Sequence, residues 1–582
     1  MRWRLIGCWM GLVGWAAMPL SAAEPQWIWS PELQPETDPA VTVYFRATFQ
    51  VASPQAGSIE IAADNKYSLW INGDRIGAGD NWRQLDRYDI QSRLKKGKNV
   101  IAVFAQNGDA PHPAGLVARV TIQDQGDRTV LASSGASWKT ATKPQPMWST
   151  VEFKDDDWKP AHVFGEFGKV GPWGDKPRVA PAPKAIVFEK QERPPGPFQL
   201  LDGDRVVFLG DTLIERAQAD DYLETRLTSR HPDRRIRFRN LGWSGDTVSG
   251  ESRAGFGSVA DGFQQLRQRV FEARPTVIIL GYGGADSAAG EAGLKDFSSG
   301  LETLLNLLEE TKATIVILSP LRQEDLGKPL PSPQSFNHNR QLYSRVLLDA
   351  AQSRAYPFVD LYSLLGDGGQ SAAKQSYTDN GVHLTHYGYW QAAAVIEGGL
   401  GWKTPVWNVE IDVRDKGLAA SGTKLDAVRI EPHKLSFQAL DQVLPPPPPP
   451  PRSPASATIP GLQRTLKISD LPEGIHVLKI AGQPVHKATA AQWGQGQIIP
   501  TTAPEFAQAE KLRQAIVAKN QLFFYRWRPQ NETYLFGFRK HEQGNNAQEI
   551  PLFDPLIEKH ETQIAMLRVP VAHLYEVVLE TK

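Results

Sequence analysis

The chain has 582 residues, which is too long for one hydrophobic core and favours roughly three or four domains. Lys plus Arg and Asp plus Glu balance at 64 each, so the charge gives no reason to expect nucleic acid or an anionic membrane as a partner. The single cysteine, Cys8, lies near the N-terminus. If that segment is removed, no thiol is left for a disulfide, a nucleophile or a metal site.

Residues 1–23 have the pattern of a signal peptide. Two arginines precede an uncharged apolar stretch from Leu5 to Leu20, and Ser21-Ala22-Ala23 supplies the small residues that a signal peptidase reads. We therefore expect cleavage before residue 24, export to the periplasm or the cell exterior, and no membrane contact afterwards. The alternative is a retained membrane anchor, for which the apolar stretch is short.

Residues 24–183 have the pattern of an all-β sandwich. Short apolar runs at 58–62, 67–71 and 100–105 recur between turn signals, and Asn72-Gly73 predicts a tight hairpin turn. Many short strands at this spacing are typical of a sandwich or jelly roll.

Three segments of this region resemble the galactose-binding-like jelly-roll modules of secreted glycan-active enzymes. They are IAADNKYSLWINGDRIG, LKKGKNVIAVFAQN and WKPAHVFGEFGKVGPWG. The resemblance implies a module that binds carbohydrate, with Trp27, Trp29 and Trp82 as candidates for stacking on a sugar ring. The alternative is a structural sandwich without a ligand.

A proline-rich linker is expected over 184–200, and after it the hydrophobic period changes. Buried apolar strands alternate with helical patterns across 201–402, which predicts a doubly wound, mostly parallel sheet. In such a sheet the site lies at the carboxyl ends of the strands. The expected strands lie near 205–209, 236–240, 276–281, 314–318 and 357–360.

Four segments after these strands resemble, in order, the conserved blocks of SGNH/GDSL-type hydrolases, a family of esterases and lipases. They are VVFLGDT, NLGWSGDT, ILGYGGADS and TDNGVHLTHYGY. The resemblance covers about 200 residues and implies a flavodoxin-like SGNH domain that cleaves ester bonds.

The resemblance also implies a role for individual residues. The nucleophile position falls on Thr212, where the family has serine. The oxyanion donors fall on Gly245 and on Ala285, where the family has asparagine. The base falls on His383. The position of its acidic partner falls on Asn380, with Asp379 one residue earlier.

Three of these residues depart from the family pattern, and each departure costs rate. The threonine methyl restricts χ1 and crowds the attacking face. Losing one oxyanion donor costs about 10²–10³ in rate, and an Asp-to-Asn change beside the histidine costs about 10⁴ in serine proteases. Purely structural roles are the alternative, with Thr212 capping a helix with Glu215 and His383 packed at a helix start. No spacing indicates a metal site or a bound cofactor.

The C-terminal third predicts an α+β extension. Residues 403–465 are β-like and contain the run Pro445–Pro451, which predicts a stiff polyproline II spacer on the surface. Residues 466–582 are expected to dock on the α/β domain, with a helix beginning at a capping box over 502–505. Arg528, Arg539 and His541 are candidates for substrate contacts. The alternative is a packed extension without a binding role.

The sequence therefore predicts a multidomain protein with an N-terminal jelly roll, a central α/β domain and a C-terminal α+β extension. Its predicted function is that of an exported hydrolase of ester groups, such as acyl groups of a polysaccharide, so the expected partner is an ester or carbohydrate substrate. The alternative function is a catalytically inactive carbohydrate-binding or scaffold protein.

Overall fold

The computed structural model separates into two units, Met1–Ala185 and Ile186–Lys582. It describes residues 24–33, 41–108, 113–124, 128–143, 145, 147–174, 178–179, 188–255, 257–365, 375–403, 405–453, 459, 462–535, 539 and 546–580. The predicted signal peptide, 1–23, lies outside the described residues. Across the described parts of the chain, no helix is long and apolar enough to cross a membrane.

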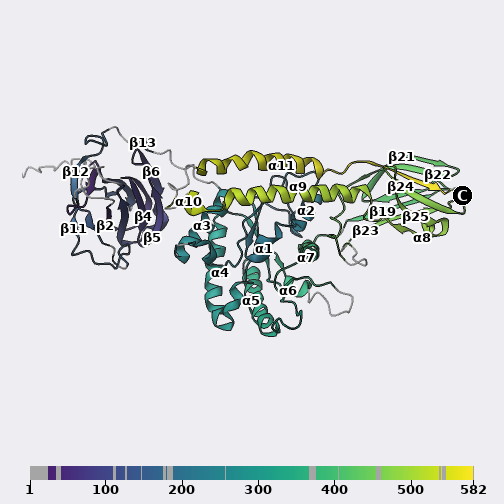
Figure 1. The fold of residues 1–582 in the computed structure, drawn as a ribbon, viewed down its shortest axis with the longest axis horizontal. Coiled ribbons are helices and arrows are strands. Elements are labelled where there is room, and N and C mark those ends of the chain that lie inside the picture. The colour runs from purple at the N-terminus through teal and green to yellow at the C-terminus, as the bar shows by residue number, and fades with distance from the viewer. Residues whose placement is uncertain are drawn as a thin grey trace, which may run out of the picture. The chain divides into compact units, whose positions relative to one another are not determined.

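The first unit is a sandwich of two sheets, which confirms the predicted all-β fold (Figure 1). One sheet has the order β12-β1-β8-β3-β6-β13, with β9 paired to β8, and the other has the order β11-β10-β2-β7-β4-β5. The pairs are antiparallel except β13 on β6. A short 3₁₀ helix, η1 (Gln91–Arg93), lies between β6 and β7. The strands are β1 (Gln26–Trp29), β2 (Thr42–Val51), β3 (Pro54–Asp64), β4 (Lys66–Ile71), β5 (Asp74–Gly79), β6 (Gln84–Asp89), β7 (Gly97–Gln106), β8 (Gly115–Asp124), β9 (Arg128–Leu131), β10 (Lys139–Ala141), β11 (Lys159–Pro160), β12 (His162–Glu166) and β13 (Arg178–Val179).

The sequence makes two specific predictions for this unit, a tight hairpin turn and tryptophans that stack on a sugar. The turn between β4 and β5 is Asn72-Gly73, and both residues have positive φ, 54° and 93°, as the hairpin turn requires. Trp27 and Trp29 are fully buried, so the expectation that they stack on a sugar is wrong. Trp27 instead stacks on Trp173 in the core, with ring centroids 4.5 Å apart.

The second unit begins with a five-stranded parallel sheet of order β15-β14-β16-β17-β18, which confirms the flavodoxin-like prediction. Alternate strand residues face two helical layers, α2 and α7 on one side and α3, α4 and α5 on the other. The strands are β14 (Arg205–Gly210), β15 (Arg237–Asn240), β16 (Val277–Gly281), β17 (Thr314–Leu318) and β18 (Phe358–Val359). The helices are α1 (Thr212–Ala217), α2 (Tyr222–Ser229), η2 (Glu251–Arg253), α3 (Val259–Ala273), η3 (Asp286–Ala289), η4 (Glu291–Gly293), α4 (Leu294–Glu309), α5 (Gln334–Ser353), α6 (Leu361–Leu364) and α7 (His386–Gly399).

The predicted linker is packed onto this domain over its described part, 188–200. Phe198 and Leu200 are buried in the core of the sheet. Arg193 forms an ion pair with the buried Asp204 at 2.7 Å. These apolar and charged contacts explain why the proline-rich composition does not give a free spacer here.

The C-terminal region adds a second β-sandwich and a helical hairpin, in keeping with the predicted α+β extension. Its sheets have the orders β20-β19-β23-β26 and β21-β22-β27-β24-β25. The expected boundary at 465/466 falls inside β23, which pairs along its whole length with β19, so the strands on both sides of that boundary share one sheet. The elements are β19 (Val406–Asp412), β20 (Leu418–Ser421), β21 (Thr423–Glu431), β22 (Lys434–Asp441), β23 (Gln463–Ser469), β24 (Ile475–Ile480), β25 (Gln483–Thr489), α8 (Ala490–Gln495), β26 (Gln497–Ile498), α9 (Pro504–Trp527), α10 (Glu532–Leu535), η5 (Asn546–Leu552), α11 (Phe553–Leu567) and β27 (His573–Leu579).

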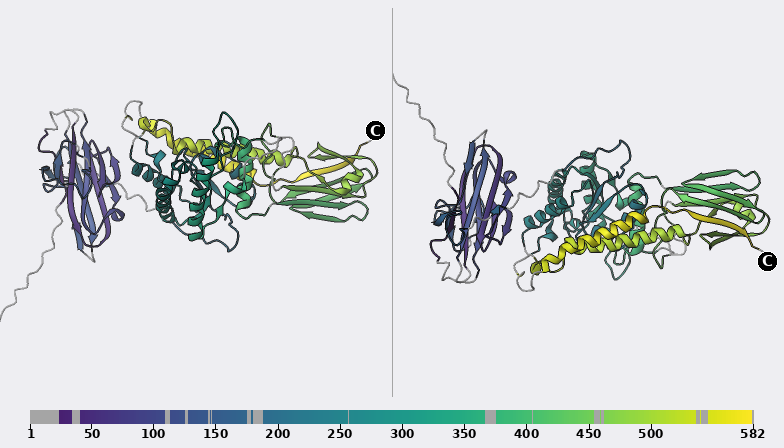
Figure 2. Two further views of the ribbon diagram at one scale, coloured as in Figure 1. Left: turned by 90° about the horizontal axis from the view of Figure 1, so that it is seen from below. Right: turned by 90° about the horizontal axis from the view of Figure 1, so that it is seen from above.

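Helices α9 and α11 lie side by side, as Figure 2 shows from two directions, and α9 packs on α2 and β15 of the α/β domain. Lys519 of α9 is fully buried and its Nζ donates to Glu224 of α2 at 2.5 Å. The helix begins at Pro504 after Ala503, with no side-chain cap, so the predicted capping box is wrong. Glu505 is buried and accepts a hydrogen bond from Tyr575 instead.

The run Pro445–Pro451 is not a surface spacer. Pro445, Pro446 and Pro447 are buried, and the Pro447 carbonyl accepts a hydrogen bond from Trp390 Nε1 of α7 at 3.0 Å. A proline has no N–H to satisfy, so an extended run of prolines can pack against other elements at low polar cost.

Candidate active site

The candidate nucleophile, Thr212, follows the first strand of the parallel sheet. Asp211 is the N-cap of α1, and its carboxylate accepts from the Leu213 N–H at 3.1 Å. The alternative that Thr212 itself caps the helix is therefore wrong, because Thr212 is the first helical residue. Its Oγ1 accepts a hydrogen bond from the Gly245 N–H at 3.0 Å.

Asp211 ties the first and third strand ends together. Its second oxygen accepts from the N–H groups of Gly284 and Ala285 at 3.0 and 3.2 Å. Burial raises the pKa of this carboxyl to about 6 despite these donors. A side chain at Gly284 would lie 2.7 Å from the same oxygen, so this loop needs glycine there.

The loop that carries Gly245 is fixed by a buried ion pair. Arg253 Nε donates to Asp246 at 2.6 Å, and the Tyr282 hydroxyl donates to the same carboxylate at 2.8 Å. Arg253 and Asp246 are 1% and 0% exposed. The ion pair therefore braces the loop after β15, and the Tyr282 hydroxyl joins that loop to the residue after β16, a role that the sequence analysis did not assign.

Arg528 supports the same loop from outside. Its Nη1 donates to Glu215 at 2.9 Å and its guanidinium lies 3.5 Å from the centre of the Trp243 ring. Glu215 also accepts from the Ser244 N–H, so it links α1, the loop and α9. Arg528 is not among the described residues that line the pocket at the carboxyl ends of the strands. A substrate contact for Arg528 stays a prediction.

The other two predicted substrate contacts are Arg539, which is not among the described residues that line the pocket at the strand ends, and His541. Arg539 stacks over Tyr534 at 4.4 Å. His541 lies outside the described residues.

His383 and Asn380 lie in the loop before α7, where a bridge joins Thr378 to Leu384. Asn380 Oδ1 accepts from the N–H groups of Val382 and His383 at 3.0 and 2.9 Å. These two donors fix the orientation of the amide, so it is Nδ2 that faces His383 Nδ1 at 3.1 Å. An amide nitrogen only donates, so Nδ1 must accept, and the neutral imidazole then carries its proton on Nε2.

Asp379 does not replace Asn380 as the partner of the imidazole. Its carboxylate lies 3.8 Å from Arg216 Nη2, and its contact with His383 is between backbone atoms, N–H to carbonyl, at 3.0 Å.

The residues of these loops border one pocket of about 120 Å³ at the carboxyl ends of the strands. Thr212 and His383 both line it, but no hydrogen bond joins their side chains among the described contacts. Ala285 presents a methyl group there, and its N–H is directed to Asp211. The lining residues are Asp211, Thr212, Leu213, Arg216, Gly281, Tyr282, Gly284, Ala285, Ser319, Pro320, Leu321, Arg340, Val382, His383, Leu384 and Tyr389.

Arg340 of α5 is a pocket residue that the sequence analysis missed. It is 9% exposed, and its Nη1 donates to the Leu321 carbonyl at 3.0 Å. No other hydrogen bond of its guanidinium is formed with a described residue. Burial lowers its pKa, and the nearby Asp211 raises it. A buried cation that opens onto a pocket is a common feature of functional sites. Arg340 lies within a helix, and no sequence motif marks it as a site residue.

Asp286, which follows the pocket residue Ala285, is a half-buried carboxyl. It accepts from the N–H groups of Val248 and Gly283 at 3.1 and 3.0 Å, and burial raises its pKa to about 7. Within the described ranges, no group of three or more His, Cys, Asp or Glu side chains is placed to hold a metal ion.

A parallel sheet with a polar pocket at its strand ends defines an α/β domain of the kind that carries enzyme sites. Residues 208–391 match the family model described as the GDSL-like Lipase/Acylhydrolase family. The match covers less than half of the chain, so it describes this segment, a GDSL-like lipase/acylhydrolase domain.

Solved structures are similar to different parts of the chain. A gut microbial diltiazem-metabolizing enzyme aligns over 66% of this chain and 99% of its own, at 15% identity and a TM-score of 0.53. An α-L-rhamnosidase from Streptomyces avermitilis aligns over 27% of this chain and 16% of its own, at 31% identity and a TM-score of 0.25. An acetylxylan esterase from Geobacillus stearothermophilus aligns over 35% and 98%, at 17% identity and a TM-score of 0.29. The sequence has no significant match among curated proteins.

Proposed function

We propose that the chain is an ester hydrolase of low turnover that uses Thr212 as nucleophile and His383 as base. One observation carries the proposal: the Thr212 hydroxyl, already bonded to the Gly245 N–H, and the His383 imidazole border the same pocket at the strand ends. Hydroxyl, base and backbone donor are the three groups that acyl transfer requires.

The reaction would proceed in two halves. Thr212 Oγ1 attacks the ester carbonyl as its proton passes to His383, and the alcohol leaves with that proton. Water then attacks the acyl-threonine with the same base, releasing the acid and restoring the hydroxyl. The Gly245 N–H, 3.0 Å from Oγ1, lies close enough to stabilise the adjacent oxyanion.

In this proposal, Asn380 is the residue that keeps the turnover of ester hydrolysis low. His383 can act as a base only when its proton is on Nδ1, but that proton would point at the Asn380 amide, which itself carries N–H groups. An asparagine also lacks the negative charge that stabilises the imidazolium during the reaction.

Arg340 is proposed as the substitute for the missing second oxyanion donor. Ala285 has no side-chain donor, whereas Arg340 lines the same pocket with a guanidinium that makes a single hydrogen bond to the described residues. A buried guanidinium stabilises a developing negative charge more strongly than a neutral amide does.

We further propose that the protein is exported and acts on acyl groups of a polysaccharide. Export is supported by the charged and apolar pattern of 1–23 with its small residues at 21–23. The polysaccharide substrate is supported by the attached β-sandwich and its resemblance to carbohydrate-binding modules. Of the three tryptophans considered for sugar stacking, Trp82 is the one that keeps an exposed face.

A non-catalytic binding role is the second candidate, and the orientation of Asn380 favours it, because the imidazole is held in the tautomer that cannot accept a proton at Nε2. Hydrolysis of p-nitrophenyl acetate by the full chain separates the two. The enzyme hypothesis expects slow turnover that Thr212→Ala and His383→Ala each reduce to background. Turnover that is absent, or that persists in both variants, would establish the binding role or a different site.

A further inference from the structure

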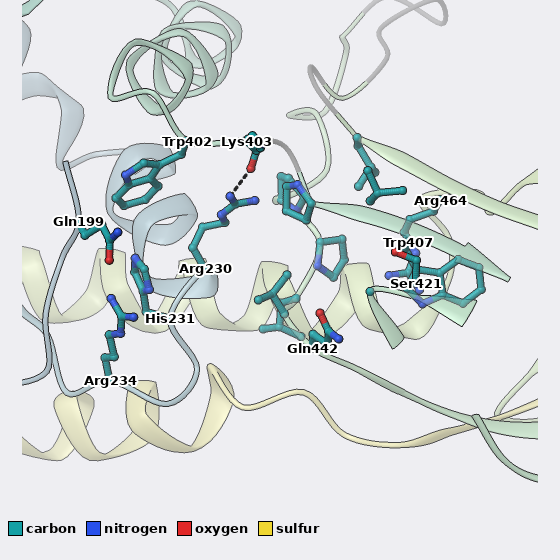
Figure 3. Close-up of a pocket in the computed structure, with 18 of the residues that line it drawn as sticks. Gln199, Arg230, His231, Arg234, Trp402, Lys403, Trp407, Ser421, Gln442 and Arg464 are labelled. Atoms are coloured by element: carbon teal, nitrogen blue, oxygen red, sulfur yellow. Dashed lines mark hydrogen bonds between the residues drawn. The ribbon is translucent and has the colours of Figure 1, made fainter. Parts of the chain in front are cut away.

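A second pocket, of about 500 Å³, lies where the α/β domain meets the C-terminal sandwich (Figure 3). We call it the rear pocket and define it by Arg230, His231, Arg234, Trp402, Lys403 and Gln442. Arg230 and Arg234 precede β15, whereas the candidate active site follows the strand ends. Because the strands are parallel, the rear pocket lies near their amino ends and the candidate active site lies at their carboxyl ends.

The rear pocket has a positive character. None of the described residues that line it is acidic, whereas Arg230, Arg234 and Lys403 are basic. Arg464 lines it as well, but its charge is paired with Asp441 and Glu505. Glu397 behind the wall is shared between Arg226 at 2.6 Å and Arg230 at 3.4 Å, so one carboxylate faces two guanidinium groups. Arg234 lies 4.0 Å from the exposed Asp233, so these cations outnumber the two carboxylates beside them and a net positive charge remains at this wall.

Two buried nitrogens of this wall have no hydrogen-bond partner within the described structure, Arg230 Nη1 and His231 Nε2. In Figure 3 the Arg230 guanidinium bonds to the Lys403 carbonyl and lies between Trp402 and the sandwich. An unsatisfied buried polar group is costly. Arg230 Nη1 needs an acceptor, whereas Nε2 of a neutral His231 donates or accepts according to its tautomer, so a ligand that carries both kinds of group would complete the site. Burial and the charge of Arg234 lower the pKa of His231 to about 4, so its ring is neutral at pH 7.

The remaining wall fits a ring better than a bare anion. The half-buried Trp402 stacks on Phe198 and meets His231 edge to face, which fixes its indole. Gln199 and Gln442 add amide groups that can bind hydroxyls. A pocket of this volume holds a ligand of drug size, larger than a single inorganic ion.

We propose that the rear pocket binds a carbohydrate unit that carries a carboxylate, that is, a hexuronate residue of an acidic glycan. The carboxylate would pair with Arg230, Arg234 and Lys403, and the apolar face of the sugar would pack on Trp402. This binding is independent of ester hydrolysis, since the two pockets share no lining residue among those described.

The test is calorimetric titration of the full chain with trigalacturonate, with neutral galactotriose and inorganic phosphate as further probes. Trigalacturonate should bind and galactotriose should bind at least roughly tenfold more weakly, because charge-assisted hydrogen bonds to the carboxylate are lost. The double variant Arg234→Gln with Lys403→Gln should weaken trigalacturonate binding by at least roughly tenfold.

A matched control removes the same charge elsewhere. Arg235 is exposed beside Arg234 and Lys295 is exposed on α4, and neither lines the pocket, so Arg235→Gln with Lys295→Gln should leave the affinity unchanged. Unaltered affinity in the Arg234/Lys403 variant, or no trigalacturonate binding by the wild type, overturns the proposal. Phosphate that binds as tightly and with the same sensitivity would show a general anion site and would also overturn it.

Discussion

Replacing Asn380 with aspartate should increase esterase activity. Asn380 Oδ1 already accepts two backbone N–H groups, and an aspartate oxygen would keep both of these bonds. Its other oxygen would take the place of Nδ2, 3.1 Å from His383 Nδ1, where it accepts a proton instead of donating one. The imidazole proton then moves to Nδ1, and Nε2 becomes free to act as the base.

The size of the gain follows from two contributions. Restoring a hydrogen bond to a charged group in the productive tautomer is worth about 1.5–3 kcal/mol, or roughly 10- to 150-fold in rate. The carboxylate charge stabilises the imidazolium as well, and the reverse change in serine proteases, about 10⁴-fold, sets the upper limit. We therefore expect kcat/KM for p-nitrophenyl acetate to rise between about 10- and 10⁴-fold.

The control is the double variant Asn380→Asp with His383→Ala, in which the gain should vanish because no imidazole is left to respond. A correctly folded Asn380→Asp protein with wild-type or lower activity would refute the tautomer argument. A gain that survives in the double variant would refute it too, because it could not then come from His383.

Substitutions at four further positions test the remaining parts of the site. Thr212→Ser removes the crowding methyl and should raise kcat/KM by roughly 2- to 10-fold, while Thr212→Ala should abolish it. Arg340→Met should lower kcat by about 10²–10³-fold with a smaller change in KM, and an unchanged kcat would exclude Arg340 as an oxyanion donor. Arg253→Met leaves the Asp246 charge buried without its ion-pair partner, with the Tyr282 hydroxyl still donating to it, and urea unfolding should show a loss of about 3–5 kcal/mol. Burial raises the pKa of Asp286 to about 7 from 3.8, so the folded state binds the carboxyl proton more tightly than the unfolded state does. The stability that this proton contributes is therefore lost as the pH rises from about 4 to 7. The unfolding free energy of Asp286→Asn relative to wild type should therefore rise by about 3 kcal/mol from pH 4.5 to 7.5, and a pH-independent difference would contradict the raised pKa.

The sequence predicts the α/β domain well because its signals are local. Parallel strands buried on both faces appear as continuous apolar runs, and glycine-rich turns follow them at fixed places. The loops that bring Thr212, Gly245 and His383 to one edge follow from the parallel topology. The Asn72-Gly73 hairpin is confirmed for the same reason, because its backbone conformation depends on the two residues themselves.

Features that depend on distant contacts were not predictable. Composition alone suggests a surface spacer for the proline run, but a hydrogen bond from Trp390 and burial against the α/β domain decide its place. Trp27 and Trp29 are core residues for a similar reason, since nothing in a tryptophan's own neighbourhood in the sequence tells a buried indole from an exposed one. Arg340 reaches the pocket from a helix with no motif of its own.

The orientation of Asn380 depends partly on local sequence and partly on a contact that only the fold supplies. An asparagine before glycine indicates a turn in which the side chain accepts backbone N–H groups, so the bonds to Val382 and His383 have a local signal. The consequence for the imidazole tautomer needs the third contact, from Nδ2 to Nδ1, which only the folded loop supplies.

The most direct test of the central claim is to identify the residue that becomes covalently modified during turnover. The full chain is incubated with a fluorophosphonate, which reacts with an activated hydroxyl, and the modified peptide is mapped by mass spectrometry. Modification of Thr212 that is lost in His383→Ala and accelerated in Asn380→Asp is the predicted result. Modification of another hydroxyl, or ester hydrolysis without any modification of Thr212, would contradict the account.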